Sequence, residues 1–259
     1  MTDRRTLDTA ARAEALRALH GPGRMLVLPN AWDAASARAI EAAGFPAVAT
    51  SSAAIAAALG YADHEKAPAY EMLKAAARIV GAVDVPVTVD FEAGYRLSPR
   101  GIVERLVEIG AAGLNLEDTD HHAAGGLVEA EPHAERLRAL KDAATSAGVN
   151  LVVNARVDTF VRRIGTPEER VAEGLRRATL YHDAGADSIY PIGLADEDSI
   201  RAFVDAVGVI NVNTRRGGPL TLERLSRLGV RRVSYGSSLF RDSVSAVEGF
   251  LLEIINQRL

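Results

Sequence analysis

The chain of 259 residues is 48% hydrophobic and 25% charged, which is typical of a globular protein with a large core and excludes a disordered chain. Its formal net charge of −4 gives no electrostatic basis for binding nucleic acid or an anionic membrane. Because cysteine is absent, disulfide bonds, thiolate metal sites and cysteine nucleophiles are all excluded.

The amino-terminal segment 1–20 is charged and has no apolar stretch followed by a cleavage site. No uninterrupted apolar run in the sequence is long enough to cross a bilayer. We therefore expect a cytoplasmic location, with neither a membrane nor a nucleic acid as partner.

Short β-branched runs alternate with amphipathic segments of helical length along the whole chain. These runs are mostly apolar throughout, as in a parallel sheet covered by helices. The expected strands are 25–30, 47–52, 86–91, 113–118, 150–156, 187–192, 208–213 and 231–236. Eight strand–helix units predict an α/β fold, a single (β/α)8 TIM barrel over residues 1–259. The alternative is an open doubly wound sheet, which more often has about five or six strands and a glycine-rich first turn.

Glycines repeatedly precede the next expected strand, where a helix would end. They are Gly44, Gly113, Gly148, Gly185 and Gly229. Because glycine adopts the left-handed conformation that ends many helices, we expect it at these positions.

The last expected helix, 239–259, has an apolar stripe at helical spacing. The stripe consists of Val244, Val247, Phe250, Leu251, Ile254 and Ile255. It must pack against either its own barrel or a neighbouring subunit, and the sequence leaves both open.

Acidic residues end two adjacent expected strands. Asp90 and Glu92 are spaced to point the same way, and Glu117 and Asp118 end the next strand. Carboxylates gathered at one mouth of a barrel repel each other unless a cation lies among them, and oxygen ligands favour Mg²⁺, with Mn²⁺ as a substitute. The alternative is that each acid caps the following helix.

Further polar residues stand at other strand ends. Arg156 could bind a substrate carboxylate or phosphate with two hydrogen bonds, or could instead pair with Asp158 or Glu117. Ser51 and Ser52 could hold a carboxylate at a helix start.

Two loops are candidates for a supporting role. His121 and His122 begin a glycine-bearing stretch that could be a lid and could move protons, or they are simply exposed. The segment 215–218, with two arginines and two glycines, could hold a phosphate or be a plain turn.

Several segments occur in the order found in one known superfamily. They are PNAWDAASARAIEAAGF from Pro29, ATSSA from Ala49, LGYADHE from Leu59, VDFEAGY from Val89, NLED from Asn115 and NARVD from Asn154. Together they make residues 29–240 resemble the isocitrate lyase and phosphoenolpyruvate mutase superfamily, and the combination is more specific than any one segment.

The resemblance implies a TIM barrel whose last helix is exchanged between subunits, and hence a homodimer or homotetramer. It implies a Mg²⁺ ion held by the acids matching Asp90, Glu92 and Glu117, partly through water. It also implies that a 2-oxo acid carboxylate is held by residues of the second and later strand ends. The expected substrate-binding residues are Ser51, Ser52, Ala53, Arg156 and Asn213. Asp63 and His121 are the candidates for moving the proton.

The chain also departs from the resemblance. The Lys-Lys-Cys-Gly-His lid of isocitrate and methylisocitrate lyases is replaced by residues 119–122, and Ile192 stands where those lyases place a glutamate. The lysine and asparagine of the phosphonate mutase lid are not evident. Glu92 replaces an aspartate, and Arg96 replaces a glycine.

These features favour a Mg²⁺-dependent lyase or decarboxylase that cleaves a C–C bond of a small 2-oxo or hydroxy dicarboxylic acid, such as oxaloacetate or a malate derivative. One alternative is a mutase or hydrolase acting on the P–C bond of phosphonopyruvate. Another is a non-catalytic protein that binds a 2-oxo acid.

Overall fold

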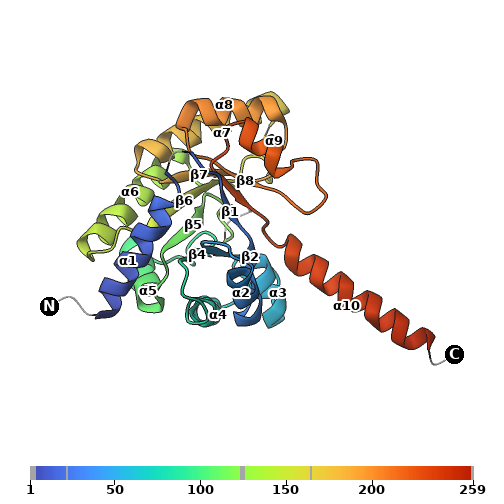
Figure 1. Cartoon of the computed structure of the whole chain (residues 1–259). Coiled ribbons are helices and arrows are strands. Elements are labelled where there is room, and N and C mark those ends of the chain that lie inside the picture. Colours follow the sequence, from blue (N-terminus) through green and yellow to red (C-terminus); the bar gives the residue numbers. More distant parts are fainter. Residues whose placement is uncertain (1–3, 22, 123–125, 164, 258–259) are drawn as a thin grey trace.

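The computed structural model describes residues 4–21, 23–122, 126–163 and 165–257. Helices surround a central ring of strands (Figure 1). The strands are β1 (Leu26–Leu28), β2 (Asn30–Ala31), β3 (Val48–Thr50), β4 (Val87–Asp90), β5 (Gly113–Glu117), β6 (Val152–Val157), β7 (Ser188–Pro191), β8 (Asn211–Asn213) and β9 (Arg232–Ser234). The helices are α1 (Arg4–Ala18), α2 (Ala34–Ala42), α3 (Ser52–Leu59), α4 (Ala69–Val80), α5 (Pro99–Ile109), α6 (Ala130–Ser146), α7 (Pro167–Asp183), α8 (Glu197–Val207), α9 (Leu222–Arg227) and α10 (Ser238–Asn256).

The strands close into a barrel. Six parallel strands run in the order β2-β3-β4-β5-β6-β7, and three more run β1-β9-β8. A parallel bridge between Ile189 and Ile210 joins β7 to the start of β8, and β1 continues into β2 after Pro29. Each of the eight predicted runs therefore overlaps a strand, and the predicted TIM barrel is confirmed. The first run is divided at Pro29 because proline has no N–H to donate to a neighbouring strand.

The barrel interior is polar, which the prediction of apolar strands did not anticipate. Outward side chains such as Val89, Leu114 and Val153 belong to the hydrophobic core between strands and helices. The alternate positions carry polar side chains, and Arg232 Nη2 on β9 donates to Asn115 Oδ1 on β5 at 3.4 Å. Since β5 and β9 are not neighbours, this hydrogen bond crosses the inside of the barrel.

Four of the five predicted helix-ending glycines have positive φ. These are Gly44, Gly148, Gly185 and Gly229, with φ of 87°, 74°, 96° and 83°. The prediction for Gly113 was wrong, because this residue begins β5 and the preceding helix ends at Gly110. A Cβ at residue 113 would lie 2.4 Å from the Val152 carbonyl oxygen, so close strand contact is what requires glycine there.

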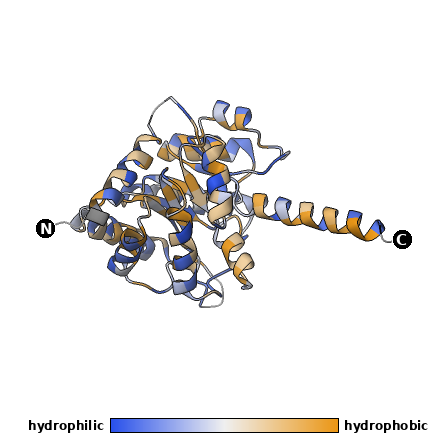
Figure 2. Ribbon diagram, turned by 60° about the horizontal axis from the view of Figure 1, so that its bottom comes forward, coloured by the Kyte–Doolittle hydropathy of each residue, from blue (hydrophilic) through white to orange (hydrophobic). Residues whose placement is uncertain are grey.

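Helix α10 projects away from the barrel, and its orange face in Figure 2 is apolar. The predicted stripe is exposed, with Val247, Phe250 and Leu251 between 53% and 60% accessible. Its first turn contacts the barrel through Phe240, whose ring centroid lies 5.5 Å from that of Trp32 in an edge-on arrangement. The stripe therefore does not pack on its own barrel. Within the described chain, no helix has both the length and the apolarity needed to cross a membrane.

Candidate active site

A cavity of about 450 Å³ opens at the carboxyl ends of the strands, where TIM barrels carry their active sites. Most of the predicted site residues line it together. They are Ser51, Ser52, Ala53, Asp63, Asp90, His121, Arg156 and Asn213. Glu92 and Glu117, the other two predicted metal ligands, lie beside the cavity and contact other side chains.

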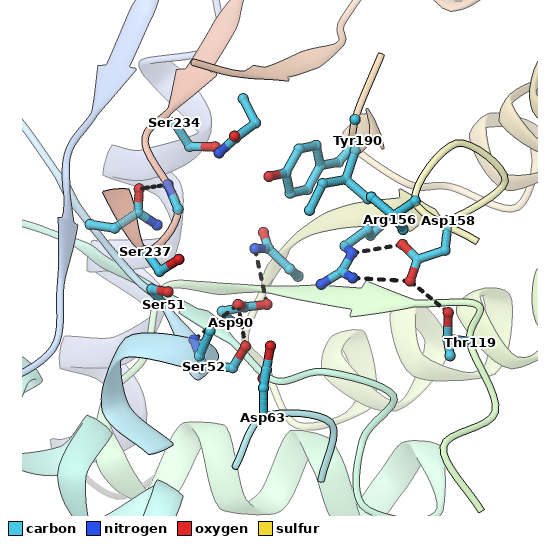
Figure 3. A pocket seen from close by; sticks show the side chains of 18 of the residues that line it. Ser51, Ser52, Asp63, Asp90, Thr119, Arg156, Asp158, Tyr190, Ser234 and Ser237 are labelled. Carbon is cyan, nitrogen blue, oxygen red and sulfur yellow. Dashed lines mark hydrogen bonds and ion pairs between the residues drawn. The ribbon is translucent and has the colours of Figure 1, made fainter. Parts of the chain in front are cut away.

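Asp90 is fixed by the start of helix α3. Ser51 caps this helix, with its hydroxyl accepting from the Ala54 N–H at 3.4 Å. The backbone N–H and the hydroxyl of Ser52 both donate to Asp90 Oδ2, at 3.0 and 2.7 Å (Figure 3). Asn115 Nδ2 donates to the other oxygen at 3.3 Å. The carboxylate of Asp90 is thereby fixed at the cavity wall.

Arg156 forms the ion pairs that the sequence left open. Its Nε and Nη2 donate to the two oxygens of Asp158 at 2.7 and 3.0 Å (Figure 3), and its Nη1 lies 2.5 Å from Glu117 Oε2. Thr119 Oγ1 also donates to Asp158, at 2.6 Å. Both acids therefore orient the guanidinium at the cavity wall.

Glu92, whose φ is 48°, does not line the cavity. Its buried carboxylate accepts from the Tyr95 hydroxyl and, at 2.6 Å, from the Glu65 N–H. Burial raises the pKa of Glu92 to about 7, against the lowering effect of these hydrogen bonds. His64, Glu65, Tyr95 and Arg96 also have positive φ, so the loop between α3 and α4 and the loop after β4 both carry backbone strain, a frequent property of functional sites.

Both histidines of the predicted lid have partners. His121 contacts Glu117, and its ring centroid lies 5.1 Å from that of His64. His122 Nε2 lies 2.7 Å from Glu65 Oε2. These pairs connect the segment after β5 to the loop before α4, so the two histidines do more than face solvent. The glycine-bearing stretch of the predicted lid includes 123–125, which lie outside the described residues.

The charges at this mouth fit a divalent cation. Burial raises the pKa of Glu117 well above its usual range; Arg156 opposes this, and Asp158, Asp90 and Asp63 add to it. Glu117 and Asp158 pair with Arg156, whereas Asp63 and Asp90 form no ion pair within the described chain, although Arg162 and Arg241 also line the cavity. Carboxylate oxygens without a paired cation are the ligands that Mg²⁺ prefers.

The arrangement does not offer a complete set of protein ligands. Over 4–21, 23–122, 126–163 and 165–257, no three acidic or histidine side chains stand close enough together to hold a metal ion as they lie. A cation beside Asp90 would therefore take several ligands from water, as the resemblance implies.

Sequence reasoning missed several residues that shape the cavity. Tyr190 and Ser234 line it from β7 and β9, and their alternation with apolar neighbours was the available signal (Figure 3). Asn30 Oδ1 accepts from the N–H groups of Tyr235 and Gly236 at 2.8 and 2.9 Å, which fixes the loop after β9. The predicted phosphate loop 215–218 does not line the cavity.

A family model described as phosphoenolpyruvate phosphomutase matches residues 16–255. The chain belongs to this family. The 2-methylisocitrate lyase of Salmonella typhimurium (strain LT2) is 29% identical over 254 residues, covering 89% of this chain and 83% of the enzyme.

Solved structures agree with this membership. A crystal structure from Burkholderia cenocepacia J2315, a phosphonomutase by provisional assignment, is 37% identical with a TM-score of 0.86, covering 93% of this chain and 98% of that one. The crystal structure of 2,3-dimethylmalate lyase is 25% identical with a TM-score of 0.83, covering 96% and 86%. The isocitrate lyase and phosphoenolpyruvate mutase superfamily is therefore confirmed, and its named lyases share this barrel.

Proposed function

We propose that this family member is a Mg²⁺-dependent lyase or decarboxylase that cleaves a C–C bond next to the oxo group of a small 2-oxo or hydroxy dicarboxylic acid. The observation that carries the proposal is that one cavity contains both acids without an ion-pair partner and a helix start that can bind an anion. Asp63 and Asp90 supply negative charge for a cation, while Ala53 lies in the first turn of α3, where N–H groups attract a carboxylate.

Each side of the cavity has a separate task in this reaction. A bound Mg²⁺ ion would stabilise the negative charge that develops on the oxo group. Asp90 would hold the ion, with Glu92 and Glu117 as further acids of the site. Arg156, oriented by Asp158, would bind the acid and place it for cleavage.

The proton that completes the reaction needs a donor beside the reacting carbon. Asp63 and His121 both line the cavity, and His121 is already hydrogen-bonded to Glu117. No cysteine exists in the sequence to take this task. We assign the proton transfer to one of these two residues.

Chemistry at a P–C bond is the second candidate function. It is favoured by the description of the matching family model and by the provisional assignment of the Burkholderia structure. Phosphonopyruvate would then be the substrate. A hydrolase would release phosphate from it, and a mutase would rearrange it to a phosphate ester.

Proton NMR of the purified protein with oxaloacetate, malate and citrate derivatives and phosphonopyruvate tests both candidates. We expect Mg²⁺-dependent C–C cleavage of one acid, abolished by EDTA. We also expect a fall of more than about 100-fold in Asp90→Ala, because a direct ligand should matter more than its supporting residues. Asp84→Ala, which removes an exposed acid before the same strand, is the matched control.

Turnover of phosphonopyruvate alone would favour the second candidate. Mg²⁺-dependent binding of an acid without any turnover would contradict both and point to a binding protein.

We also propose that the protein is a homo-oligomer in which α10 of one copy packs on the barrel of another. An apolar groove lies beside the base of α10, lined in part by Trp32, Ile40, Phe45 and Leu239. The groove and the exposed stripe of α10 have matching apolar character, and both would otherwise face water.

A further inference from the structure

A cluster of buried polar side chains lies behind the cavity wall and joins β5, β6 and α7. Asp118 and Tyr181 are fully buried, and Arg177 is 5% exposed. None of the three lines the cavity. They are nevertheless connected to Arg156 through a short series of hydrogen bonds.

The series begins at Arg156 and runs away from the cavity. Asp158 holds two nitrogens of the Arg156 guanidinium, and the backbone N–H of Asp158 donates to Asp118 Oδ1 at 2.9 Å. The other oxygen of Asp118 accepts from Arg177 Nη1 at 2.9 Å and from the Tyr181 hydroxyl at 2.8 Å. Helix α7 is thereby linked to the end of β6.

Arg177 makes further contacts from the same position. Its Nη1 donates to the Val128 carbonyl at 2.8 Å, and its Nε donates to Glu173 at 2.7 Å. The Val128 N–H in turn donates to the Asp118 carbonyl at 2.8 Å. The guanidinium therefore fixes Asp118 from its side chain and from the segment packed on its backbone.

A buried ion pair of this kind is weak evidence for a role in stability, because apolar side chains of similar volume often stabilise a core equally well. Its distinctive property is direction, since planar groups with several hydrogen bonds can occupy one orientation only. Here the fixed orientation of Asp118 determines, through Asp158, the orientation of Arg156, the residue expected to bind the substrate.

We propose that Asp118, Arg177 and Tyr181 are positioning residues that set the orientation of the Arg156 guanidinium. The consequence for catalysis rests on the proposed function of Arg156. The orientation itself does not, because it is a property of the protein without substrate and can be measured directly.

The test uses ¹⁵N NMR of the Nε–Hε group of Arg156, assigned by its disappearance in Arg156→Lys. In Arg177→Lys the charge beside Asp118 remains but the planar geometry is lost. We expect the Arg156 Nε–H to exchange with water roughly tenfold faster in this variant, and less strongly so in Tyr181→Phe. Arg176→Lys, the same change at the neighbouring exposed arginine of α7, should leave the exchange unchanged.

Binding and turnover provide the second readout. We expect KM for the cleaved acid to rise roughly tenfold in Arg177→Lys, with the affinity for Mn²⁺ unchanged, because Asp90 is held separately by Ser52.

Unchanged Arg156 exchange in folded Arg177→Lys and Tyr181→Phe would overturn the proposal. The proposal would also be overturned if Arg177→Lys lost Mn²⁺ affinity and if the Nε–H groups of unrelated arginines exchanged faster to the same extent as that of Arg156. That pattern indicates a purely structural role. If Arg177→Lys fails to fold, Tyr181→Phe alone decides. If wild type turns over no acid, the proposed function fails while the NMR result still stands.

Discussion

The two oxygens of Asp90 have unequal surroundings. Oδ2 accepts two hydrogen bonds from Ser52, whereas Oδ1 has only a long contact with Asn115. The less occupied oxygen is therefore the better candidate for binding a cation. Ser52 was predicted to hold a substrate carboxylate, yet in the structure its donors hold Asp90, so it would support the metal site.

Ser52→Ala should consequently weaken Mg²⁺ or Mn²⁺ binding by roughly tenfold, the lower end of the range for residues that orient a ligand. The backbone N–H of residue 52 still donates, so binding should not be abolished. Mn²⁺ titration followed by electron paramagnetic resonance measures the change. Ser146→Ala, at an exposed hydroxyl on α6, is the control, and equal affinity in all three proteins would contradict this role for Ser52.

Residues at strand ends could be predicted from the strand pattern, whereas the loop residue Asp63 was found only through the family resemblance and the contacts of the loops were not predicted. Asp90 and Arg156 follow the two-residue period of a strand, so their common destination is implied by the barrel. Glu92 has a positive φ and does not line the cavity, and no pattern of residue types reveals such a backbone conformation for a glutamate. Glu65 binds both Tyr95 and His122 from an irregular loop, where no period exists to indicate it.

At the scale of elements, helix α6 carries a histidine with an unusual environment. His133 is buried, its ring centroid is 4.9 Å from that of Tyr181, and neither ring nitrogen has a hydrogen-bond partner among the described residues. Burial, helped by Arg136 and Arg177, lowers the pKa of His133 to about 3. The folded protein therefore keeps this histidine neutral.

Stability should fall as the pH is lowered past the unfolded-state pKa of about 6.5, because the unfolded chain then binds a proton that the folded chain refuses until about pH 3. At pH 5 the loss from His133 is about 2 kcal/mol. His133→Leu should remove this part of the difference in unfolding free energy between pH 7 and pH 5, measured by denaturant titration.

His182→Leu, at an exposed histidine of α7, is the control for this measurement. The same pH dependence in His133→Leu and wild type would show that His133 does not hold the neutral form. Some pH dependence should remain in the variant, since burial also lowers the pKa of His20, to about 4.

At the scale of the whole molecule, the exposed stripe of α10 predicts self-association. Phe250→Glu places a charge in the middle of the stripe, where burying it would be costly. We expect wild type to sediment as two or more chains and Phe250→Glu as a monomer in analytical ultracentrifugation. Ser245→Glu, at an exposed position about 140° around the helix from Phe250, should behave as wild type, and a monomeric wild type would contradict the proposal.

The barrel as a whole was predictable because alternating strands and helices admit few architectures. The position of α10 could not be predicted, because an apolar stripe indicates that a helix is covered but does not indicate which chain covers it. The polar interior was also missed, because the expected run 208–213 reads as apolar through Val209 and Ile210, whereas β8 itself contains two asparagines.

That polar interior separates two demands that compete in many enzymes. The apolar side chains that stabilise the fold lie between strands and helices, while the side chains facing the barrel axis are amides, hydroxyls and charges. Replacing an inward residue that lines the cavity should therefore alter chemistry more than it alters folding, whereas replacing a buried one such as Asn154 costs stability through the lost hydrogen bond to its partner Asn115. A barrel divided in this way can change its substrate quickly during evolution, because mutations that change substrate preference at the cavity have little effect on the stability that the outer layer maintains.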